Sequence, residues 1–317
     1  MGLQEECTVD RSCWMCGSND QTILFENNKI PTVSPRDACG FKLVRCKQCG
    51  AVRVNPAPCK ENLISYYPKD YYLEDSHINE LLFEIVGKFY RRNRFKVLLT
   101  KLNSNTNTKK KVLEIGPGRG DNLVPFLKQG YSVFAIEPNE KLADVVKDLG
   151  VNVETSYIEK ASNVPLDFDV VILSHVLEHE YDPNKMLAYC KDHMKGGAYI
   201  YVEVPVLDAT SFRVFGRHWG DLEFPLHLSL MKRSHLEKML EQAGFSIIEK
   251  KYRTLIGDTT RSFEKIFGCS SSNNNVKNVL VDMLGATYQL LFVLLNKLTR
   301  KGEAVVVIAK KLECHTI

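Results

Sequence analysis

The fold is decided by the stretch Val112-Leu113-Glu114-Ile115-Gly116-Pro117-Gly118-Arg119-Gly120-Asp121. A short apolar run stops at three glycines in alternate positions, and a helical pattern comes next. This order predicts a buried strand, a tight turn, and a helix whose first N–H groups face the turn. The glycines allow positive φ angles and let a ligand approach the backbone. In open α/β sheets, nucleotides bind at such a turn, at the carboxyl end of a parallel strand.

The charges around this turn indicate the kind of nucleotide. The dinucleotide fingerprint is G-x-G-x-x-G, whereas the third glycine here comes one residue early. Glu114 lies two residues before the first glycine, where its carboxylate would repel a pyrophosphate and attract a cation. The next predicted strand ends at Glu137-Pro138, where an acidic side chain can accept both hydroxyls of a ribose. A sulfonium amino acid carried by a nucleoside suits these charges better than NAD does.

These two motifs, together with the apolar segment Phe168–His179, resemble the class I S-adenosylmethionine-dependent methyltransferases over roughly residues 80–255 plus the final strand. The resemblance implies a Rossmann-like α/β fold with a seven-stranded sheet whose last strand is antiparallel. An ordinary strand–helix turn with chance acidic neighbours is the alternative. By resemblance, S-adenosylmethionine is bound by Glu114, Gly116 and Gly118 at its methionine part, by Glu137 and Pro138 at its ribose, and by Ser174 and His175 beside the methyl group.

The pattern along the chain predicts the other elements. Strands are expected near 111–116, 131–137, 151–155, 168–174 and 198–204, and helices near 119–129, 139–149, 182–194 and 232–242. Asp182-Pro183 is a favourable start for a helix, and Gly196-Gly197 should end it. The last two strands, 245–253 and 304–311, form an antiparallel pair at the sheet edge in the family.

A helical insertion is expected at about 254–303, with a polar loop at 270–275 and an apolar segment at 279–298. Polar residues interrupt this segment, and no run reaches eighteen apolar residues. We expect a helix that packs on the domain or forms a homodimer contact. Contact with a membrane surface and a membrane-spanning helix are the alternatives.

Two C-x-x-C-G knuckles near the N-terminus contain Cys13, Cys16, Cys46 and Cys49. Four thiolates on two tight turns are typical of a closed tetrahedral zinc site, which is structural. A hairpin of strands at 22–25 and 41–45 should fill the gap between the knuckles. A disulfide pair or free thiols are the alternatives. The other six cysteines lack partners at ligand spacing and are expected to be thiols without a role (Cys7, Cys39, Cys59, Cys190, Cys269 and Cys314).

These motifs divide the chain into three parts: a zinc-ribbon module at 1–60, an aromatic segment with a leading helix at 61–108, and the methyltransferase domain at 109–317. The aromatic segment, Tyr66–Tyr72, is expected either to cover the active site as a lid or to fix the zinc module to the domain. The leading helix should run from Ile78 to about Leu102, where apolar residues recur at helical spacing.

Composition narrows the class of protein. Net charge is +4, from 42 basic and 38 acidic side chains among 317 residues, so nucleic acid is not an expected partner. The first residues carry acidic side chains and no apolar signal segment, which favours a cytoplasmic protein. Ten cysteines in a chain of this length, without such a segment, do not indicate a secreted disulfide scaffold.

Three histidines are candidate bases, because histidine titrates near neutral pH. His175 and His179 flank the end of the strand predicted at 168–174, and His227 comes after the strand predicted at 198–204, in the polar-aromatic segment Trp219–His227. We expect His227 to accept a proton from the methyl acceptor, with a core or capping role as the alternative. Metal binding by His175 and His179 is conceivable, but the sequence offers no third ligand.

The residues after the strand at 168–174 indicate the class of acceptor. Methyltransferases of amide or base nitrogens often carry Asn/Asp-Pro-Pro-Tyr there, and this chain does not. The knuckles, the aromatic segment and a Pro-x-His loop resemble bacterial methyltransferases of sugars and surface polysaccharides, including deoxysugar C-methyltransferases. Those enzymes have His-Glu-His where this chain has Pro225-Leu226-His227, and they add a further C-terminal domain. Transfer to a hydroxyl or amine of a sugar or glycan precursor is therefore expected at least as much as C-methylation.

Two other functions compete with this hypothesis. One is RNA methylation with the zinc module contacting RNA, but the knuckles carry few basic residues beyond Arg45 and Lys47. The other is a non-catalytic protein that joins a zinc-ribbon interaction module to a degenerate cofactor fold. The complete set from Glu114 to Glu137 argues against degeneracy.

Overall fold

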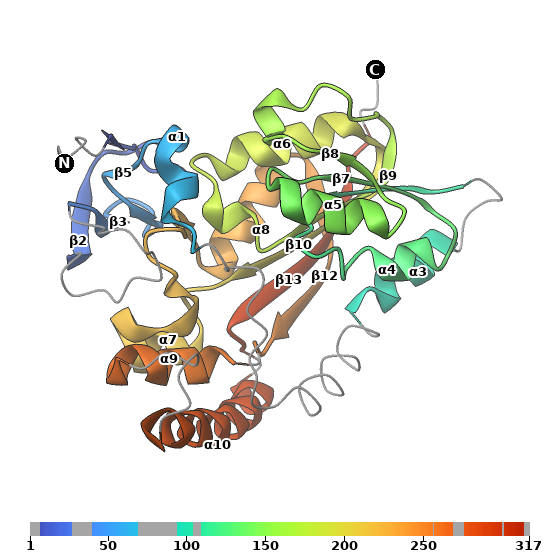
Figure 1. The fold of residues 1–317 in the computed structure, drawn as a ribbon. Coiled ribbons are helices and arrows are strands. Elements are labelled where there is room, and N and C mark those ends of the chain that lie inside the picture. Colours follow the sequence, from blue (N-terminus) through green and yellow to red (C-terminus); the bar gives the residue numbers. More distant parts are fainter. Residues whose placement is uncertain are drawn as a thin grey trace.

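The computed structural model describes residues 7–26, 40–68, 94–103, 109–255, 257–268, 276–299 and 301–313. At its centre is a seven-stranded sheet in the order β12-β13-β10-β9-β6-β7-β8 (Figure 1). The strands are β6 (Lys111–Ile115), β7 (Ser132–Ile136), β8 (Asn152–Glu154), β9 (Phe168–Ser174), β10 (Met194–Pro205), β12 (Phe245–Arg253) and β13 (Ala304–Lys311). Strands β6 to β10 pair in parallel, and β13 runs antiparallel to both of its neighbours. This is the class I methyltransferase sheet that the sequence predicts.

Helices cover both faces of this sheet. Helices α6 (Pro183–His193) and α8 (Arg233–Gln242) bury Leu187, Leu236 and Leu240 against one face. On the other face, α3 (Lys96–Asn103), α4 (Val124–Leu127) and α5 (Glu140–Asp148) contribute Leu98, Phe126 and Val146. The fold therefore has three layers, with an apolar core on each side of the sheet.

Most predicted boundaries agree with the structure. Helix α6 begins where expected, because the Asp182 carboxylate accepts hydrogen bonds from the amides of Asn184 and Lys185. Two predictions are wrong in detail. The helix expected at 119–129 is shortened to Val124–Leu127, because residues 119–123 are taken up by turns after the glycines. Helix α6 ends before the glycine pair at 196–197, which lies inside β10.

Asp169, at the start of β9, fixes structure, as its position suggests. Its carboxylate accepts from the Lys111 amide (2.9 Å) and from the ammonium groups of Lys195 (3.0 Å) and Lys110 (3.4 Å). Burial alone would raise the pKa of this carboxyl, but these three donors lower it below its usual range. The contacts tie the starts of β6 and β10 to β9.

We expect Asp169→Ala to lower the free energy of unfolding by about 1–2 kcal/mol at pH 7, because charge-assisted hydrogen bonds are lost. A carboxyl whose pKa is lowered by folding stabilises the fold above its unfolded pKa of about 4 and stops doing so as the pH falls through its folded value. Urea unfolding at pH 7 and pH 3 should therefore show a difference from wild type that shrinks in acid. Equal stability at pH 7 would contradict this role.

A second, smaller sheet lies beside the first and has the order β11-β4-β3-β2 (Figure 1). Strands β2 (Gln21–Glu26), β3 (Lys42–Cys46) and β4 (Val52–Val54) come from the N-terminal region, and the predicted hairpin is β2–β3. Strand β11 (Ser229–Leu230) comes from the methyltransferase part and pairs with Val52 and Arg53 of β4. The small sheet is thus completed by a segment that lies 176 positions further along the sequence, from Arg53 to Ser229.

Cys7 and Cys59 form a disulfide bond. The expectation that both are thiols without a role is therefore wrong. The bond joins β1 (Thr8–Val9) and β5 (Ala57–Pro58), which pair antiparallel, at the start of α1 (Lys60–Leu63). Disulfides are rare in cytosolic proteins, so this bond counts against the expected cytoplasmic location. Cys190 is a buried thiol, as expected, whereas Cys39, Cys269 and Cys314 lie outside the described residues.

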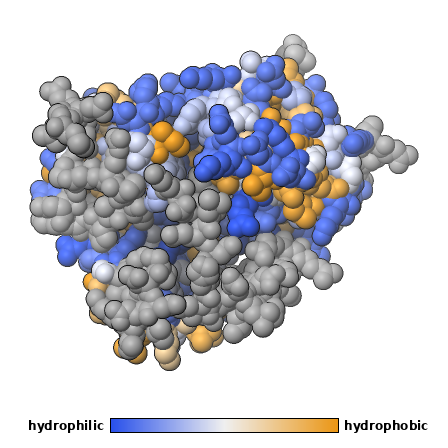
Figure 2. Space-filling view, viewed as in Figure 1, coloured by the Kyte–Doolittle hydropathy of each residue, from blue (hydrophilic) through white to orange (hydrophobic). Residues whose placement is uncertain are grey.

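The chain between β12 and β13 contains helices α9 (Asp258–Phe267) and α10 (Val276–Thr299), which lie with α7 (Thr210–Phe215) near the end of the sheet where β12 ends and β13 begins (Figure 1). Gly285 of α10 approaches Thr260 of α9 so closely that a Cβ there would lie 2.4 Å from the Thr260 hydroxyl. The other face of α10 exposes Leu280, Leu290, Leu294 and Leu298, and apolar surface is visible at the bottom of Figure 2, where Figure 1 places this helix. Among the described helices, none is long and apolar enough to cross a membrane. A homodimer contact through α10 stays a prediction.

Candidate functional site

A cavity of about 550 Å³ opens at the carboxyl ends of β6, β7 and β9. This volume lies in the range of small-molecule and cofactor sites. Most of the site residues predicted from the sequence line it, and Glu114 does not. One group of lining residues follows the strands β6, β7 and β9 and consists of Gly116, Gly118, Glu137, Pro138, Ser174 and His175. A second group, joined by mutual contacts, consists of Tyr67, His179, Glu223 and His227. We call the parts of the wall that these groups form the cofactor end and the acceptor end.

The glycine turn has the conformation that the sequence predicts. Gly116, Gly118 and Gly120 have φ angles of 62°, 56° and 79°, which side chains rarely adopt. A Cβ at Gly116 would lie 3.1 Å from Val176 Cγ2, whereas one at Gly118 would meet no heavy atom within 4 Å. The turn is therefore packed on its protein side and open at Gly118, where it faces the cavity.

Glu137 is 5% exposed and reaches the cofactor end from the end of β7. One carboxylate oxygen accepts from the Asn139 amide at 2.9 Å. Burial raises the pKa of this carboxyl, and the amides of Asn139 and Gly118 oppose the shift. A carboxylate held in this way at a strand end has the position and acceptor capacity that a ribose diol needs.

Glu114 lies behind the cavity wall, since it is fully buried and is not one of the lining residues. Its Oε1 accepts from the side-chain amide of Asn122 (2.7 Å), which does line the cavity. Its Oε2 is buried without a hydrogen-bond partner in the described part of the chain. Burial raises the pKa of Glu114 to about 7. The unsatisfied Oε2 thus lies behind the cavity wall, and Glu114 reaches the cavity only through the Asn122 side chain.

A buried ion network that sequence reasoning missed supports the floor of the cavity. Glu203, inside β10, accepts from Arg94 and Arg253, and from the Tyr201 hydroxyl at 2.6 Å. Arg94 also donates to Ser174 Oγ, a predicted cofactor contact. Burial would raise the pKa of Glu203, but Arg94 and the other donors hold it well below its usual range. A carboxylate within the apolar strand 198–204 was the available signal for this network.

His175 has a φ angle of 57°, a strained conformation for a residue with a side chain. Its two ring nitrogens face carboxylates, with Nδ1 3.2 Å from Glu178 Oε1 and Nε2 3.6 Å from Glu203 Oε1. Burial lowers the pKa of His175, but these two carboxylates outweigh it and raise the pKa to about 10. Both nitrogens therefore carry protons near neutral pH, which suits a hydrogen-bond donor rather than a base.

His179 and His227 lie together at the acceptor end, with ring centroids 4.6 Å apart and the rings edge to face. His179 Nδ1 is 3.0 Å from the Tyr67 hydroxyl. His227 Nδ1 is 2.7 Å from the Asp221 carbonyl, an acceptor, so this nitrogen carries the proton and Nε2 carries the lone pair. Burial is the main cause that lowers the pKa of each histidine to about 4. Both are neutral near pH 7, and the structure groups His179 with His227 rather than with His175.

The aromatic segment, as far as it is described, contacts both the N-terminal module and the cavity. Tyr66 is buried against Phe41 of the module, with ring centroids 5.6 Å apart. Tyr67 lines the cavity and contacts His179. Residues 69–72 and the start of the leading helix lie outside the described residues.

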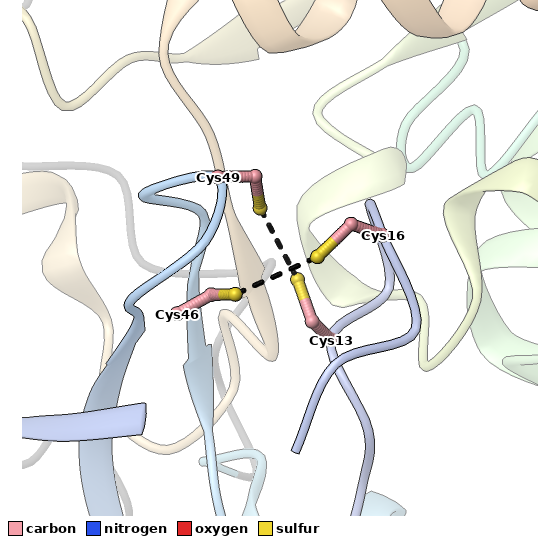
Figure 3. A group of neighbouring side chains, drawn as sticks. All are labelled: Cys13, Cys16, Cys46 and Cys49. Atoms are coloured by element: carbon pink, nitrogen blue, oxygen red, sulfur yellow. Dashed lines mark hydrogen bonds between the residues drawn. The ribbon is translucent and has the colours of Figure 1, made fainter. Parts of the chain in front are cut away.

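The four knuckle cysteines converge on one point (Figure 3). Cys13 Sγ is 3.5 Å from Cys49 Sγ, and Cys16 Sγ is 3.6 Å from Cys46 Sγ. In a tetrahedral zinc–thiolate site the sulfurs lie about 3.8 Å apart. The cluster therefore has the donors, number and spacing that a metal ion requires.

The cysteine cluster is coupled to the acceptor end through the chain just after His227. Arg11, two residues before the first knuckle, donates to the Leu228 carbonyl (3.0 Å) and to Ser229 Oγ (2.9 Å). His235 Nε2 is 3.0 Å from the Cys49 carbonyl. Together with the β11–β4 pairing, these contacts hold the segment after His227 on the N-terminal module.

Comparison with known proteins gives a consistent assignment. A family profile described as "Methyltransferase domain" matches residues 90–250. The chain is 26% identical over 152 residues to the ubiquinone biosynthesis O-methyltransferase of Rhizobium etli, covering 44% of this chain and 61% of that protein. It is 30% identical over 98 residues to the protein of the same name from Coxiella burnetii, covering 29% and 42%. The chain thus spans less than two thirds of the length of either relative.

Solved structures of similar fold include a putative sarcosine dimethylglycine methyltransferase from Galdieria sulphuraria, with a TM-score of 0.49, 12% identity, and coverage of 70% of this chain and 86% of that one. Another is an S-adenosylmethionine-dependent methyltransferase from Archaeoglobus fulgidus, with a TM-score of 0.42, 22% identity, and coverage of 71% and 99%.

Proposed function

This chain belongs to the methyltransferase-domain family, and on that premise we propose that it transfers the methyl group of S-adenosylmethionine to a small polar acceptor, a sugar or glycan precursor. One observation carries the proposal: a single cavity joins the glycine turn and Glu137 to two neutral histidines. The names of the curated relatives describe O-methyltransferases, which supports oxygen as the acceptor atom.

The residues at the cofactor end fit S-adenosylmethionine. Glu137 and Pro138 would hold the ribose, and Gly116, Gly118 and Ser174 the methionine part. Glu114, which does not reach the cavity, would act by orienting the Asn122 amide. When bound, the cofactor supplies a methyl group that its sulfonium already makes electrophilic. The chain therefore has to align the acceptor, exclude water and prepare the acceptor oxygen for attack.

The histidine pair would prepare that oxygen. The lone pair of His227 Nε2 is fixed by the hydrogen bond from Nδ1 to the Asp221 carbonyl, and the second neutral ring, His179, stands next to it. In the simplest arrangement, His227 Nε2 accepts the hydroxyl proton directly. His175 would not act as the base, since both of its nitrogens face carboxylates, and it would contribute a fixed positive charge at the cavity wall.

We also propose that the four knuckle cysteines bind a structural zinc ion. Four thiolates close the coordination sphere, so the ion has no open position for chemistry. One edge of β4 is already paired with β11, which supports a role in holding the acceptor end rather than in gripping RNA.

Labelled methyl transfer tests the proposed reaction. The full chain is incubated with S-adenosylmethionine carrying an isotopic methyl group and with sets of sugars, nucleotide sugars, phenols and amines. We expect label to appear on a hydroxylated acceptor. Calorimetry run in parallel should show cofactor binding at about micromolar level, near −8 kcal/mol. Tight NADH binding without a response to S-adenosylmethionine would refute the proposal.

Glu137→Ala should weaken binding of S-adenosylmethionine about 10- to 150-fold, the equivalent of one charge-assisted hydrogen bond. Glu137→Gln should lose less affinity for S-adenosylmethionine than Glu137→Ala, because its amide oxygen still accepts a hydrogen bond from one ribose hydroxyl. Glu140→Ala, a change of an exposed carboxylate three residues further on, is the matched control and should bind like wild type. Calorimetry measures all three, and unchanged affinity in Glu137→Ala would remove this residue from the cofactor site.

A further inference from the structure

We propose that Glu178, His179 and His227 form a second metal site, which binds a divalent transition-metal ion at the acceptor end of the cavity. One potential ligand atom from each residue lies within 4.8 Å of the other two. Glu178 and His179 belong to the short helix Leu177–His179 after β9, and His227 comes from the loop before β11. Three donors from two distant segments thus converge beside the space that the acceptor would occupy.

The separation of the three ligand atoms is small enough for one ion to join them. Around a tetrahedral ion with bonds of 2.0–2.1 Å, ligand atoms lie about 3.3 Å apart. Closing the group requires each atom to move by about 1 Å, which small side-chain rotations provide. The ligand set of two imidazoles and one carboxylate is used by both zinc and non-haem iron enzymes.

The lone pairs of these side chains favour a bound cation. His227 Nδ1 donates to the Asp221 carbonyl, so Nε2 presents a lone pair, and this nitrogen lies 3.5 Å from Glu223 Oε2. Glu178 Oε2 is buried in a residue only 1% exposed and has no hydrogen-bond partner in the described part of the chain. A positive ion would satisfy both the lone pair of His227 Nε2 and the unpartnered oxygen of Glu178.

Each proposed ligand also has an outer partner that holds it. His179 contacts the Tyr67 hydroxyl through Nδ1 (3.0 Å), His227 contacts the Asp221 carbonyl through Nδ1 (2.7 Å), and Glu178 Oε1 contacts His175 Nδ1 (3.2 Å). Metal-binding histidines almost always use their second nitrogen in this way, because it fixes the ring and the tautomer. The remaining nitrogen of each ring is left for the ion.

This site would differ from the cysteine cluster in chemistry. Three protein ligands leave a coordination position open toward the cavity, whereas four thiolates leave none. Imidazole ligands favour zinc, iron, cobalt or nickel over magnesium. An ion here would bind the acceptor hydroxyl and lower its pKa, with the proton passing to the Glu223 carboxylate. This role rests on the proposed function, and the histidines then act through the ion rather than as direct bases.

Cobalt binding to the full chain tests the site without any acceptor. Protein with zinc on its cysteines is dialysed against Co²⁺, and bound metals are counted by elemental analysis. We expect one cobalt and one zinc per chain, with a weak visible spectrum and no thiolate-to-cobalt charge-transfer band. Glu178→Gln and His227→Ala should bind cobalt at least 10-fold more weakly while keeping zinc. His193→Ala, outside the cavity, should match wild type.

The outcomes separate this inference from the proposed function. Wild-type protein that holds zinc alone at millimolar cobalt overturns the second site, as does full cobalt binding by His227→Ala. A thiolate band with only one metal ion per chain would place that ion at the cysteines and also overturns it. If cobalt does not bind but labelled methyl transfer occurs, the metal site fails and the proposed function stands. If cobalt binds and no methyl acceptor is found, the metal site stands and the proposed function fails.

Discussion

Cys13→Ser and Cys49→Ser should each remove the zinc ion proposed for the cysteine cluster and disorder the N-terminal module. Structural zinc contributes about 10–16 kcal/mol of apparent binding free energy in small domains, which is more than a sheet of this size gains by packing. Losing one of four thiolates should therefore unfold the module rather than loosen it. Elemental analysis of freshly purified protein measures the first effect.

The cysteine substitutions should also loosen the acceptor end of the cavity. Strand β11 depends on β4 for its backbone pairing, and Arg11 holds Leu228 and Ser229. We expect amide hydrogen exchange at residues 227–230 to speed up and the methyl-transfer rate to fall, while β6 stays protected. Cys190→Ala removes a buried thiol elsewhere and is the control. Full zinc content in Cys13→Ser, or zinc loss without faster exchange at 227–230, would contradict this coupling.

His227→Ala should slow single-turnover methyl transfer to a hydroxyl by about 10²–10⁴-fold and leave cofactor affinity unchanged. The expectation is the same whether the ring takes the proton or holds the proposed ion, because either route prepares the acceptor oxygen. The ring lies at the acceptor end, away from the glycine turn and Glu137, so S-adenosylmethionine should bind normally. His193→Ala is again the matched control.

The result distinguishes several roles for this histidine. A His227→Ala variant as fast as wild type would return His227 to a structural role and point to an amine acceptor, whose proton can leave to water. A slow variant that no longer binds acceptor would make the histidine a positioning residue. Calorimetry with acceptor separates this case from a loss in the chemical step.

Structural features could be predicted from the sequence where the contacts that form them are local. The glycine turn needs positive φ angles within five residues, the knuckles hold each cysteine pair on one turn, and Glu137 ends a strand that hydrophobicity marks clearly. Each of these features is encoded within a few neighbouring residues. The predicted strands agree with the structure to within a few residues for the same reason.

Contacts between residues from distant segments could not be predicted from the sequence. Two carboxylates keep His175 from acting as a base, and one of them, Glu203, belongs to another strand. The histidine that accompanies His179 proved to be His227, 48 positions further on by difference of residue numbers, and not His175. The pairing of β11 with β4 and the Cys7–Cys59 bond are equally non-local. The spacing of residues along the sequence predicts single turns and strands, but it does not predict which distant segments come into contact.

The disulfide has a consequence for the unfolded chain. Cys7 and Cys59 are separated by 52 positions, and both knuckles lie between them. Joining the ends of a segment reduces the number of conformations it can adopt before folding. The four knuckle sulfurs are thereby confined to a smaller volume and meet at a higher effective concentration. Oxidation of Cys7 and Cys59 should thus raise the affinity of the knuckle cysteines for the proposed zinc ion.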